Sequence, residues 1–452
     1  MASSTARAMC KSKRFLFVWW DGGGNMPPAL HLVRQLTARG HQVHVIGDPV
    51  SENAFKDGGA TFSAFKRAPQ RKNLLPESDP LRDWEAQTPK QAIRILRNRL
   101  LFGPALAYAK DTLEQIARFD PDALAIMDLT FGALLAAECS GIPAALIVPH
   151  ILPYPVPGRP PFGPGLLPAR NFAERLRDRV LSALLQKELA KGLPAFNIAR
   201  TCLGLAPVAG VFDQVWRADR ILVLTSEALE LPGGPLPSNV RYTGPVLADP
   251  CWAKHREGPW PPGDGNPLVL LSLSSTFQDQ RAVLQRAINA LTQLPVRGVV
   301  TLGPALNVAD FHAAQNIAIY PSVPHSQILP FADAMITHCG HGSVVRALAH
   351  RVPLICMPMG RDQNDIAARV VYHQAGLRIS PASSTEEIRQ AIENVLKNAS
   401  YRDAARRIGD AIRKDAAEST TVHELEMLAI PHNDRVRSHR LPRHGAGSVS
   451  GA

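Results

Sequence analysis

The sequence lacks the features that mark secreted, membrane-spanning and metal-binding proteins. Its six cysteines are scattered, form no Cys-x-x-Cys pair and have no metal-ligand spacing to a histidine cluster. No uninterrupted apolar run reaches the roughly 20 residues that a membrane helix needs. The first apolar run, 15–20, is too short for a signal-peptide core and precedes glycines and prolines. We therefore predict a cytoplasmic protein without integral membrane association and without a metal site.

The charge of the chain is basic but spread out. Charged residues make up 20% and apolar residues 45% of the sequence, the balance of a globular protein with sizeable cores. The formal net charge is +11, and the arginines are distributed along amphipathic stretches and in a polar segment after Pro431. This distribution predicts a solvated basic surface, a disordered basic tail at 431–452 and no nucleic-acid partner.

Short apolar runs alternate with amphipathic stretches in both halves, which predicts repeated strand–helix units and parallel sheets. The length of 452 residues exceeds the about 250–300 at which a single core stops growing, so we expect two domains and a cleft. The predicted fold class is α/β, with two Rossmann-like domains facing each other. The clearest strand candidates are 14–20, 42–46, 123–127, 144–148, 220–224, 268–273, 298–302, 317–320, 334–337 and 352–357.

Proline and glycine divide the chain. Between 231 and 267 the composition changes to proline, glycine and single aromatics, so we expect no regular structure there. Helices are expected at 28–39, 279–294 and near 385–397, the last with a capping box of Ser384 and Glu387. The resulting division is a first domain at 1–235, a linker at 236–267, a second domain at 268–415, a helix packing back on the first domain at 416–430, and the tail.

A glycine-rich turn links a strand and a helix in the segment from Asp333 to Gln363, DAMITHCGHGSVVRALAHRVPLICMPMGRDQ. Glycines let the backbone approach a ligand, and the turn aims unpaired helix N-terminal amides at it. Such a turn favours an anion such as a diphosphate, to which Ser343 and His338 can donate. A turn that only packs helix against strand is the alternative, but it has no need of the imidazoles of His338 and His341.

THCGHGS, followed by ALAHRVPLICMPMGRDQ, resembles the nucleotide-sugar signature of the family 1 glycosyltransferases, enzymes of the GT-B fold that use UDP- or TDP-sugars. The resemblance implies that the second domain binds the donor and the first binds the acceptor, with no cofactor beyond the donor itself. It also implies two groups of contacts. The diphosphate is held by His338, Gly340, Gly342 and Ser343, and the hydroxyls of the donor sugar are bound by Asp362 and Gln363.

Two further segments resemble the same family. Ser275 and Thr276 follow a strand where the family has a Ser-x-Gly-Ser/Thr loop, so both are candidate diphosphate contacts. Val323 and His325 stand where the family places its base-contacting segment, often Trp-x-Pro-Gln in plant members. The tryptophan is absent here, which leaves the identity of the base open. Arg346 replaces a ribose-binding glutamate of many members and either contacts phosphate or ribose oxygens or lies solvated on its helix.

The first-half segment DGGGNMPPALHLVRQLTARGHQV resembles the family's Gly-His-x-x-Pro turn and following helix, with Asn25 in place of the histidine. In the family that histidine is the general base for the acceptor hydroxyl, and a buried aspartate orients it. The matching aspartate is Asp128, at the C-terminal end of a predicted parallel strand. Asn25 cannot accept a proton at neutral pH but can accept a hydrogen bond from the acceptor. Asn25 and Asp128 are therefore the catalytic candidates.

Three explanations for the missing base stay open. Asp128 itself acts as the base, the acceptor is an acidic phenol that ionises with little help, or the protein binds without turnover. His150, just after the strand 144–148, is a further proton acceptor from the same sheet edge. A histidine that caps a loop is the expected interpretation there, so we do not assign it a catalytic role.

The segment 150–168, HILPYPVPGRPPFGPGLLP, has too much proline for regular structure and predicts a stiff apolar loop. In the family this region helps to form the acceptor pocket, so His150, Tyr154 and Phe162 are acceptor-binding candidates. The stretch 84–108 is expected to close the same pocket. An apolar wall suits a small lipophilic or phenolic acceptor, such as a flavonoid or a polyketide.

Taken together, these features predict an inverting, metal-independent transfer of a hexose from a UDP- or TDP-sugar to a hydroxyl, giving a β-glycoside. The stereochemical outcome is implied by the resemblance alone. The phosphate loop stabilises the departing diphosphate electrostatically. Two rival functions are a nucleotide-sugar epimerase of the same fold and a non-catalytic nucleotide-sugar-binding partner protein, which would account directly for Asn25.

Overall fold

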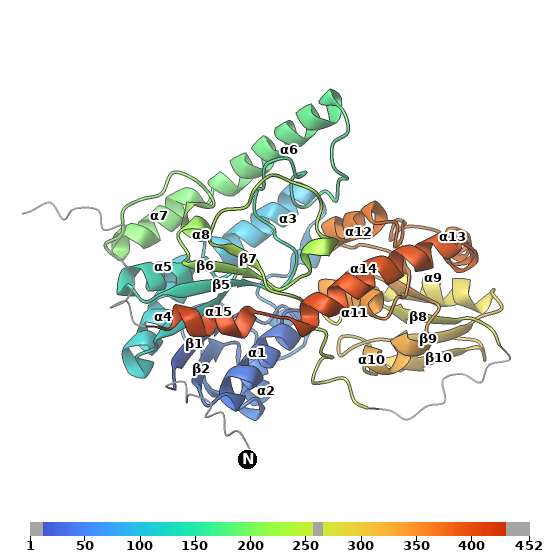
Figure 1. The fold of residues 1–452 in the computed structure, drawn as a ribbon, viewed down its shortest axis with the longest axis horizontal. Coiled ribbons are helices and arrows are strands. Elements are labelled where there is room, and N and C mark those ends of the chain that lie inside the picture. Colours follow the sequence, from blue (N-terminus) through green and yellow to red (C-terminus); the bar gives the residue numbers. More distant parts are fainter. Residues whose placement is uncertain (1–11, 256–264, 431–452) are drawn as a thin grey trace, which may run out of the picture.

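The computed structural model describes residues 12–255 and 265–430, which form two parallel sheets with flanking helices (Figure 1). The predicted α/β fold class is confirmed by these two sheets. The predicted tail at 431–452 lies outside the described residues, as does part of the predicted linker. No helix of the described ranges is both long and apolar enough to cross a membrane.

The first sheet has seven parallel strands in the order β3-β2-β1-β4-β5-β6-β7. These are β1 (Arg14–Trp19), β2 (Gln42–Gly47), β3 (Thr61–Ala64), β4 (Ala123–Met127), β5 (Ala144–Val148), β6 (Arg220–Val223) and β7 (Val240–Tyr242). The central strands β4 and β5 are buried along their whole length, because helices cover both faces of a parallel sheet. The helices are α1 (Met26–Ala38), α2 (Glu52–Asp57), α3 (Pro89–Leu96), α4 (Ala105–Phe119), α5 (Phe131–Ser140), α6 (Phe172–Ala190), α7 (Leu193–Cys202) and α8 (Asp213–Trp216).

The second sheet has six parallel strands in the order β10-β9-β8-β11-β12-β13. These are β8 (Leu268–Ser272), β9 (Arg297–Thr301), β10 (Ile317–Tyr320), β11 (Ala334–Thr337), β12 (Leu354–Cys356) and β13 (Gly376–Arg378). The helices after β8 are α9 (Arg281–Thr292), α10 (His325–Ile328), α11 (His341–Ala349), α12 (Gln363–Tyr372), α13 (Thr385–Lys397), α14 (Ala399–Ala417) and α15 (Thr421–Leu428). The predicted capping box is confirmed at the start of α13.

Strand order reverses next to β1 in the first sheet and next to β8 in the second. At such a switch point the loops after neighbouring strands diverge, and ligands of open α/β sheets bind at these carboxyl ends. The segment 20–25 follows β1, and Asp128 follows β4. In the second sheet, the segment 273–276 follows β8 and His338 follows β11. Asn25 and Asp128 therefore lie at the first switch point, and Ser275, Thr276 and His338 lie at the second.

The expectation of no regular structure between 231 and 267 is wrong at one place. β7 lies within that segment and pairs in parallel with β6 as the edge strand of the first sheet. Three residues are too few to show an apolar alternation in a segment rich in proline and glycine. The first sheet thus ends at Tyr242, beyond the predicted domain boundary at 235.

The C-terminal helices connect the two sheets (Figure 1). α14 packs against α11 of the second sheet, and α15 packs against α1, β4 and β5 of the first. Further contacts cross between the two halves. The Thr225 hydroxyl lies 2.8 Å from Nε2 of His341, and the Asp365 carboxylate accepts hydrogen bonds from the amides of Gly163 and Gly165. Burial raises the pKa of Asp365 to about 6.

Candidate active site

The glycine-rich segment of the first half lies against the serine–threonine segment of the second. Gly23 has a φ of 84°, and a Cβ there would lie 2.5 Å from the Thr276 methyl group and 3.4 Å from the Ser275 hydroxyl. A side chain at this position would be strained and would clash. Glycine thus lets the loop after β1 touch the loop after β8, which brings the two switch points together.

The phosphate loop of the second half has the geometry of an anion site. α11 begins directly after Gly340, and no side chain caps its first amides. His338 is buried beside it, and its Nδ1 has no hydrogen-bond partner among the described residues. Burial, reinforced by the nearby charge of Arg361, lowers the pKa of His338 to about 3, so the ring is neutral. A buried polar atom without a partner is one that a ligand can satisfy, and a neutral imidazole can donate one N–H.

Gly340 is required by the position of the His338 ring. A Cβ on residue 340 would lie 2.5 Å from Nε2 of His338. We expect Gly340→Ala to displace the ring and to weaken nucleoside diphosphate binding by about 10- to 100-fold, because a hydrogen bond to a charged group contributes about 1.5–3 kcal/mol. Titration calorimetry with UDP and TDP measures this change. Gly360→Ala is the matched control, since a Cβ there meets nothing within 4 Å; equal affinities of the two variants would contradict the assignment.

The remaining predicted diphosphate contacts lie on the same loops. Gly342 and Ser343 are in the first turn of α11 and are partly exposed. Ser275 and Thr276 lie opposite Gly23, and the Thr276 hydroxyl is 3.1 Å from that of Ser274. Five features therefore belong to the same region of the structure. They are the two loops of the second half, the turn of the first half, His338 and the N-terminus of α11.

The segment predicted to contact the base is more buried than the phosphate loop, and most of its polar atoms already have partners. The Val323 side chain is buried in the core beside β8 and β11, and its contact with the base stays a prediction. The amide of His325 donates to Asp249, and its Nε2 lies 3.2 Å from the Thr301 hydroxyl. Burial lowers the pKa of His325 to about 3. Only its Nδ1 has no partner among the described residues.

Of the two alternatives for Arg346, the solvated one is wrong, and contact with phosphate or ribose oxygens stays a prediction. Its side chain is buried rather than solvated. Its Nη1 donates to the carbonyl of Ala248 at 3.1 Å, and its Nε lies 3.8 Å from the Asp249 carboxylate. Arg346 thus fixes the segment between the two sheets to α11.

The predicted sugar-binding pair lies at the start of α12. Asp362 precedes the helix, and its side chain makes no hydrogen bond to another described residue. The Gln363 Oε1 accepts from the amides of Met359 and Gly360 at 2.8 and 3.1 Å, and its Nε2 donates to Gln278 at 3.0 Å. Gln363 therefore shapes the loop before it, whereas the Asp362 carboxylate keeps its hydrogen-bonding capacity.

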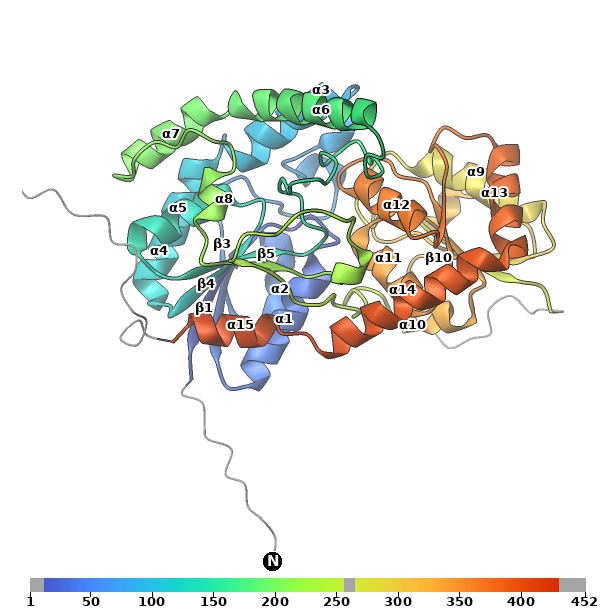
Figure 2. The ribbon, with the colours of Figure 1, turned by 45° about the horizontal axis from the view of Figure 1, so that its top comes forward.

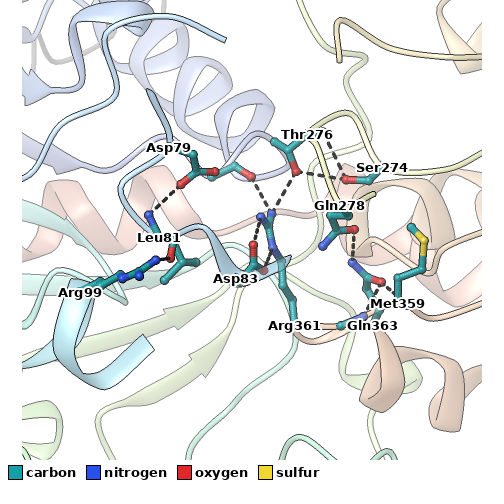
Figure 3. Close-up of polar contacts among 12 residues, drawn as sticks. Asp79, Leu81, Asp83, Arg99, Ser274, Thr276, Gln278, Met359, Arg361 and Gln363 are labelled. Atoms are coloured by element: carbon teal, nitrogen blue, oxygen red, sulfur yellow. Dashed lines mark hydrogen bonds and ion pairs between the residues drawn. The ribbon is translucent and has the colours of Figure 1, made fainter. Parts of the chain in front are cut away.

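Arg361 is a site residue that the sequence analysis misses. It joins the donor loop to the first half, where its Nε and Nη2 donate to the two carboxylate oxygens of Asp83 at 2.6 and 3.0 Å (Figure 3). Its Nη1 points the other way, 3.2 Å from the Thr276 hydroxyl and 3.4 Å from the carbonyl of Gly22. Burial alone would raise the pKa of Asp83, but the charge and hydrogen bonds of Arg361 outweigh it and hold that pKa below its usual value.

Asn25 closes the glycine-rich turn. Its Nδ2 donates to the carbonyl of Trp20 at 2.9 Å, and its Oδ1 accepts from the amide of Gly22 at 3.0 Å. Both ends of the amide are engaged within the turn, and the side chain is buried. An acceptor hydroxyl could reach only the second lone pair of Oδ1. The structure thus gives Asn25 a role in holding the turn.

Asp128 and His150 form a pair at the adjacent ends of β4 and β5. The Asp128 carboxylate is fully buried, and its Oδ2 lies 3.3 Å from Nε2 of His150, which is 17% exposed. The His150 Nδ1 donates to the carbonyl of Ile151 at 2.8 Å. Burial lowers the pKa of His150, but the charge and hydrogen bond of Asp128 outweigh it, with a further contribution from Asp362, and the pKa rises to about 9. His150 therefore does more than cap a loop.

The two aromatic acceptor candidates are both partly or wholly packed. Tyr154 is buried between Phe212 and Trp216, and its hydroxyl donates to the carbonyl of Asp128. Tyr154 therefore holds the backbone at Asp128 and does not form an open wall of an acceptor pocket. Phe162 is half-buried against the core of the second sheet, so the proline-rich loop spans both halves. The predicted closing stretch touches the second half through Trp84, whose ring lies 5.3 Å from that of Phe277.

Comparisons with known proteins agree with this geometry. Residues 211–418 match the family model described as UDP-glucoronosyl and UDP-glucosyl transferase. The 4'-demethylrebeccamycin synthase of Lentzea aerocolonigenes is 27% identical, with 92% of this chain and 98% of that protein aligned. The demethyllactenocin mycarosyltransferase of Streptomyces fradiae is 24% identical over 93% of this chain and 88% of its own.

A solved structure shares the fold over nearly the whole chain. The glycotransferase of kitacinnamycin superimposes with a TM-score of 0.69 at 19% identity, covering 92% of this chain and 99% of that one. The predicted GT-B fold is confirmed by this likeness. The chain is therefore a glycosyltransferase that uses nucleotide-sugar donors, and residues 211–418 are similar to the UDP-glucoronosyl and UDP-glucosyl transferase family.

Proposed function

We propose that the enzyme transfers a hexose, with inversion, from a UDP- or TDP-sugar to a hydroxyl of a small lipophilic or phenolic acceptor, giving a β-glycoside. The observation that supports this best is the Asp128–His150 pair. It lies at the carboxyl end of the first sheet, and His150 is close enough to Asp362 of the donor loop for that charge to raise its pKa. A proton-accepting group of the first half and the predicted sugar-binding carboxylate of the second therefore lie within electrostatic range of each other.

His150 can receive the acceptor proton if its ring leaves the Ile151 carbonyl. Nδ1 is hydrogen-bonded to a carbonyl and Nε2 lies 3.3 Å from a carboxylate oxygen, an arrangement that favours the doubly protonated imidazolium. In the neutral ring Nε2–H stays on Asp128, and Nδ1 accepts the hydroxyl proton. The acceptor oxygen then bonds to the anomeric carbon, and the bond from that carbon to the diphosphate oxygen breaks. Asp128 stabilises the imidazolium that forms, as a carboxylate does in a nucleophile–histidine–aspartate triad.

The departing diphosphate carries the electron pair of the broken bond, and the second half supplies its stabilisation. The amides at the start of α11, His338, the segment 275–276 and the Nη1 of Arg361 converge on one region. Preorganised donors of this kind act where charge develops in the transition state. No cofactor enters these steps, and independence of a metal ion remains a prediction.

The protonation state of His150 predicts an alkaline rate profile. Its pKa of about 9 lies above the ordinary value, so the neutral, proton-accepting form is the minor one at neutral pH. We expect kcat/KM for an alcohol acceptor to rise about tenfold per pH unit below that pKa and to level off near it. Initial rates between about pH 6 and 10 measure this rise of kcat/KM with pH. An alcohol is used because a phenol ionises near pH 10, and a flat profile would contradict proton transfer to His150.

Mass spectrometry distinguishes the proposed transfer from its rivals. Purified protein is incubated with UDP- and TDP-hexoses and a panel of phenols, polyketides and aliphatic alcohols. A product with the mass of acceptor plus hexose, with a β-anomeric coupling by NMR, supports the proposal. Nucleotide-sugar converted to its epimer without an acceptor product would favour the epimerase. Nucleotide binding with no turnover on any acceptor would leave only the non-catalytic partner protein.

A further inference from the structure

Helix α6 carries large apolar side chains on its outer face. Only Leu189 of its nineteen residues is buried. The exposed fractions are 69% for Phe172, 50% for Leu176, 50% for Val180 and 54% for Leu184. Figures 1 and 2 show the helix along one edge of the first half, lying beside α3. Exposed apolar groups on this scale mark an interaction surface when they are contiguous.

The four side chains form one continuous stripe. They are spaced four residues apart, which places consecutive members on neighbouring turns of the same face. Over twelve residues the stripe turns by about 120°, and exposed Ala173 and Ala183 fall within it. Leu167, 45% exposed, lies just before the helix. The opposite face of α6 packs on α3, so the stripe points away from the protein.

One edge of the stripe is basic, and the other carries a single arginine. Helical geometry places Arg175 and Arg179 beside Phe172 on one edge and Arg177 beside Leu184 on the other. All three arginines and Lys187 are exposed. Arg177 pairs with Asp178, whereas Arg175, Arg179 and Lys187 form no salt bridge with another described residue. Cationic side chains on both sides of an apolar face are typical of helices that lie on anionic membranes.

The charges argue against a second copy of the chain as the occupant. Two α6 stripes related by a two-fold axis would pair antiparallel, with Phe172 against Leu184 of the other copy. Such an axis lies in the plane of the interface, perpendicular to both helices. Each edge of one stripe then lies beside the same edge of the other stripe, so Arg175 and Arg179 of both copies would share one edge. Four like charges beside an apolar contact oppose association. An anionic lipid surface instead complements every one of them.

We propose that α6 docks this enzyme on an anionic membrane surface, with the apolar stripe in the headgroup boundary and the flanking arginines on lipid phosphates. Helix α6 begins shortly after the loop 150–168, and that loop begins at His150 of the Asp128–His150 pair. Docking through α6 thus brings the first half, and the start of its acceptor loop, next to the bilayer. The inference does not depend on which acceptor the enzyme uses.

Co-sedimentation of the full chain with lipid vesicles tests this proposal. Vesicles of phosphatidylcholine with about 30% phosphatidylglycerol are compared with pure phosphatidylcholine, at low and high salt. We expect binding to the anionic vesicles only. The pair Leu176→Ser with Leu184→Ser and, separately, the pair Arg175→Glu with Arg179→Glu should each lower the partition coefficient at least tenfold. Transfer to a water-soluble acceptor should not change in either variant.

Matched controls lie on the second half. Phe331, 63% exposed, is changed to Ser, and Arg406 with Arg407, both exposed on α14, are changed to Glu. These variants should bind vesicles like the parent. Three results would overturn the proposal: no vesicle binding by the parent, equal loss in the control variants, or unchanged binding in both α6 variants. A concentration-dependent dimer that only the Leu176/Leu184 variant loses, without vesicle binding, would assign the stripe to a second copy. Binding of an acidic amphipathic peptide in place of vesicles would assign it to a protein partner.

Discussion

Changing His150 to Gln should lower kcat for an alcohol acceptor by about 10²- to 10⁴-fold, the usual contribution of a general base. Glutamine can keep the hydrogen bond to Asp128 but cannot take a proton at neutral pH. The affinity for UDP or TDP should stay the same, because the predicted diphosphate contacts lie on the second half. Steady-state kinetics and calorimetry separate the two effects. His312→Gln, at an exposed position, is the control and should leave kcat unchanged.

Asp128→Asn distinguishes the open explanations for the missing base. If His150 takes the proton, the loss of the carboxylate charge lowers its pKa, and the acidic limb of the rate profile moves to lower pH. The maximum rate also falls, because the imidazolium loses its partner. If Asp128 were the base, Asp128→Asn would abolish transfer while His150→Gln kept most of it. If the acceptor is an acidic phenol that needs no base, both variants would keep full activity on phenols.

The strands and the donor loop could be predicted because their signals are local. A glycine-rich turn between an apolar strand and a helix favours an anion site, and the segment from His338 to Gln363 carries this signal without tertiary information. The strand positions follow from the burial of both faces of a parallel sheet, which leaves long apolar runs. The local signal fails at β7, which is too short to show a pattern.

The pairing of Asp128 with His150 could not be predicted with the same certainty. The two residues are brought together because β4 and β5 are neighbours in register, with Met127 opposite Ile147. Strand order is a property of the whole sheet, and the sequence shows only that each residue follows a strand. The asparagine at position 25 suggests Asp128 as the base, whereas the histidine that contacts Asp128 follows the neighbouring strand.

The sequence also contains a signal that could have predicted Arg361. It is the only cation in MGRDQ, directly before the predicted sugar-binding pair. What the sequence does not show is Asp83, 278 positions earlier, which lies one residue before the stretch expected to close the acceptor pocket. The bidentate contact between the two residues is what turns Nη1 toward Thr276 and Gly22.

Changing Arg361 to Gln should lower kcat/KM by about 10²- to 10³-fold, the range found when one donor to a developing negative charge is removed. The guanidinium presents Nη1 between the segment after β8 and the turn after β1, where the leaving diphosphate is expected. Arg361→Lys should recover little, because an ammonium group cannot bind Asp83 through two parallel hydrogen bonds and contact phosphate as well. Initial rates with saturating acceptor, together with the melting temperature of each variant, separate catalysis from folding.

Asp83 should act only through Arg361, as a positioning residue. Asp83→Asn keeps the shape of the side chain but removes the charge that orients the guanidinium, so we expect a loss of about tenfold in kcat/KM. In the double variant Asp83→Asn with Arg361→Gln, the effect should be no larger than that of Arg361→Gln alone, because a positioning residue has nothing left to position. Additive losses would mean that Asp83 has an independent role, such as an acceptor contact. Equal falls in melting temperature with unchanged kcat in both single variants would reduce the pair to a structural bridge between the two halves.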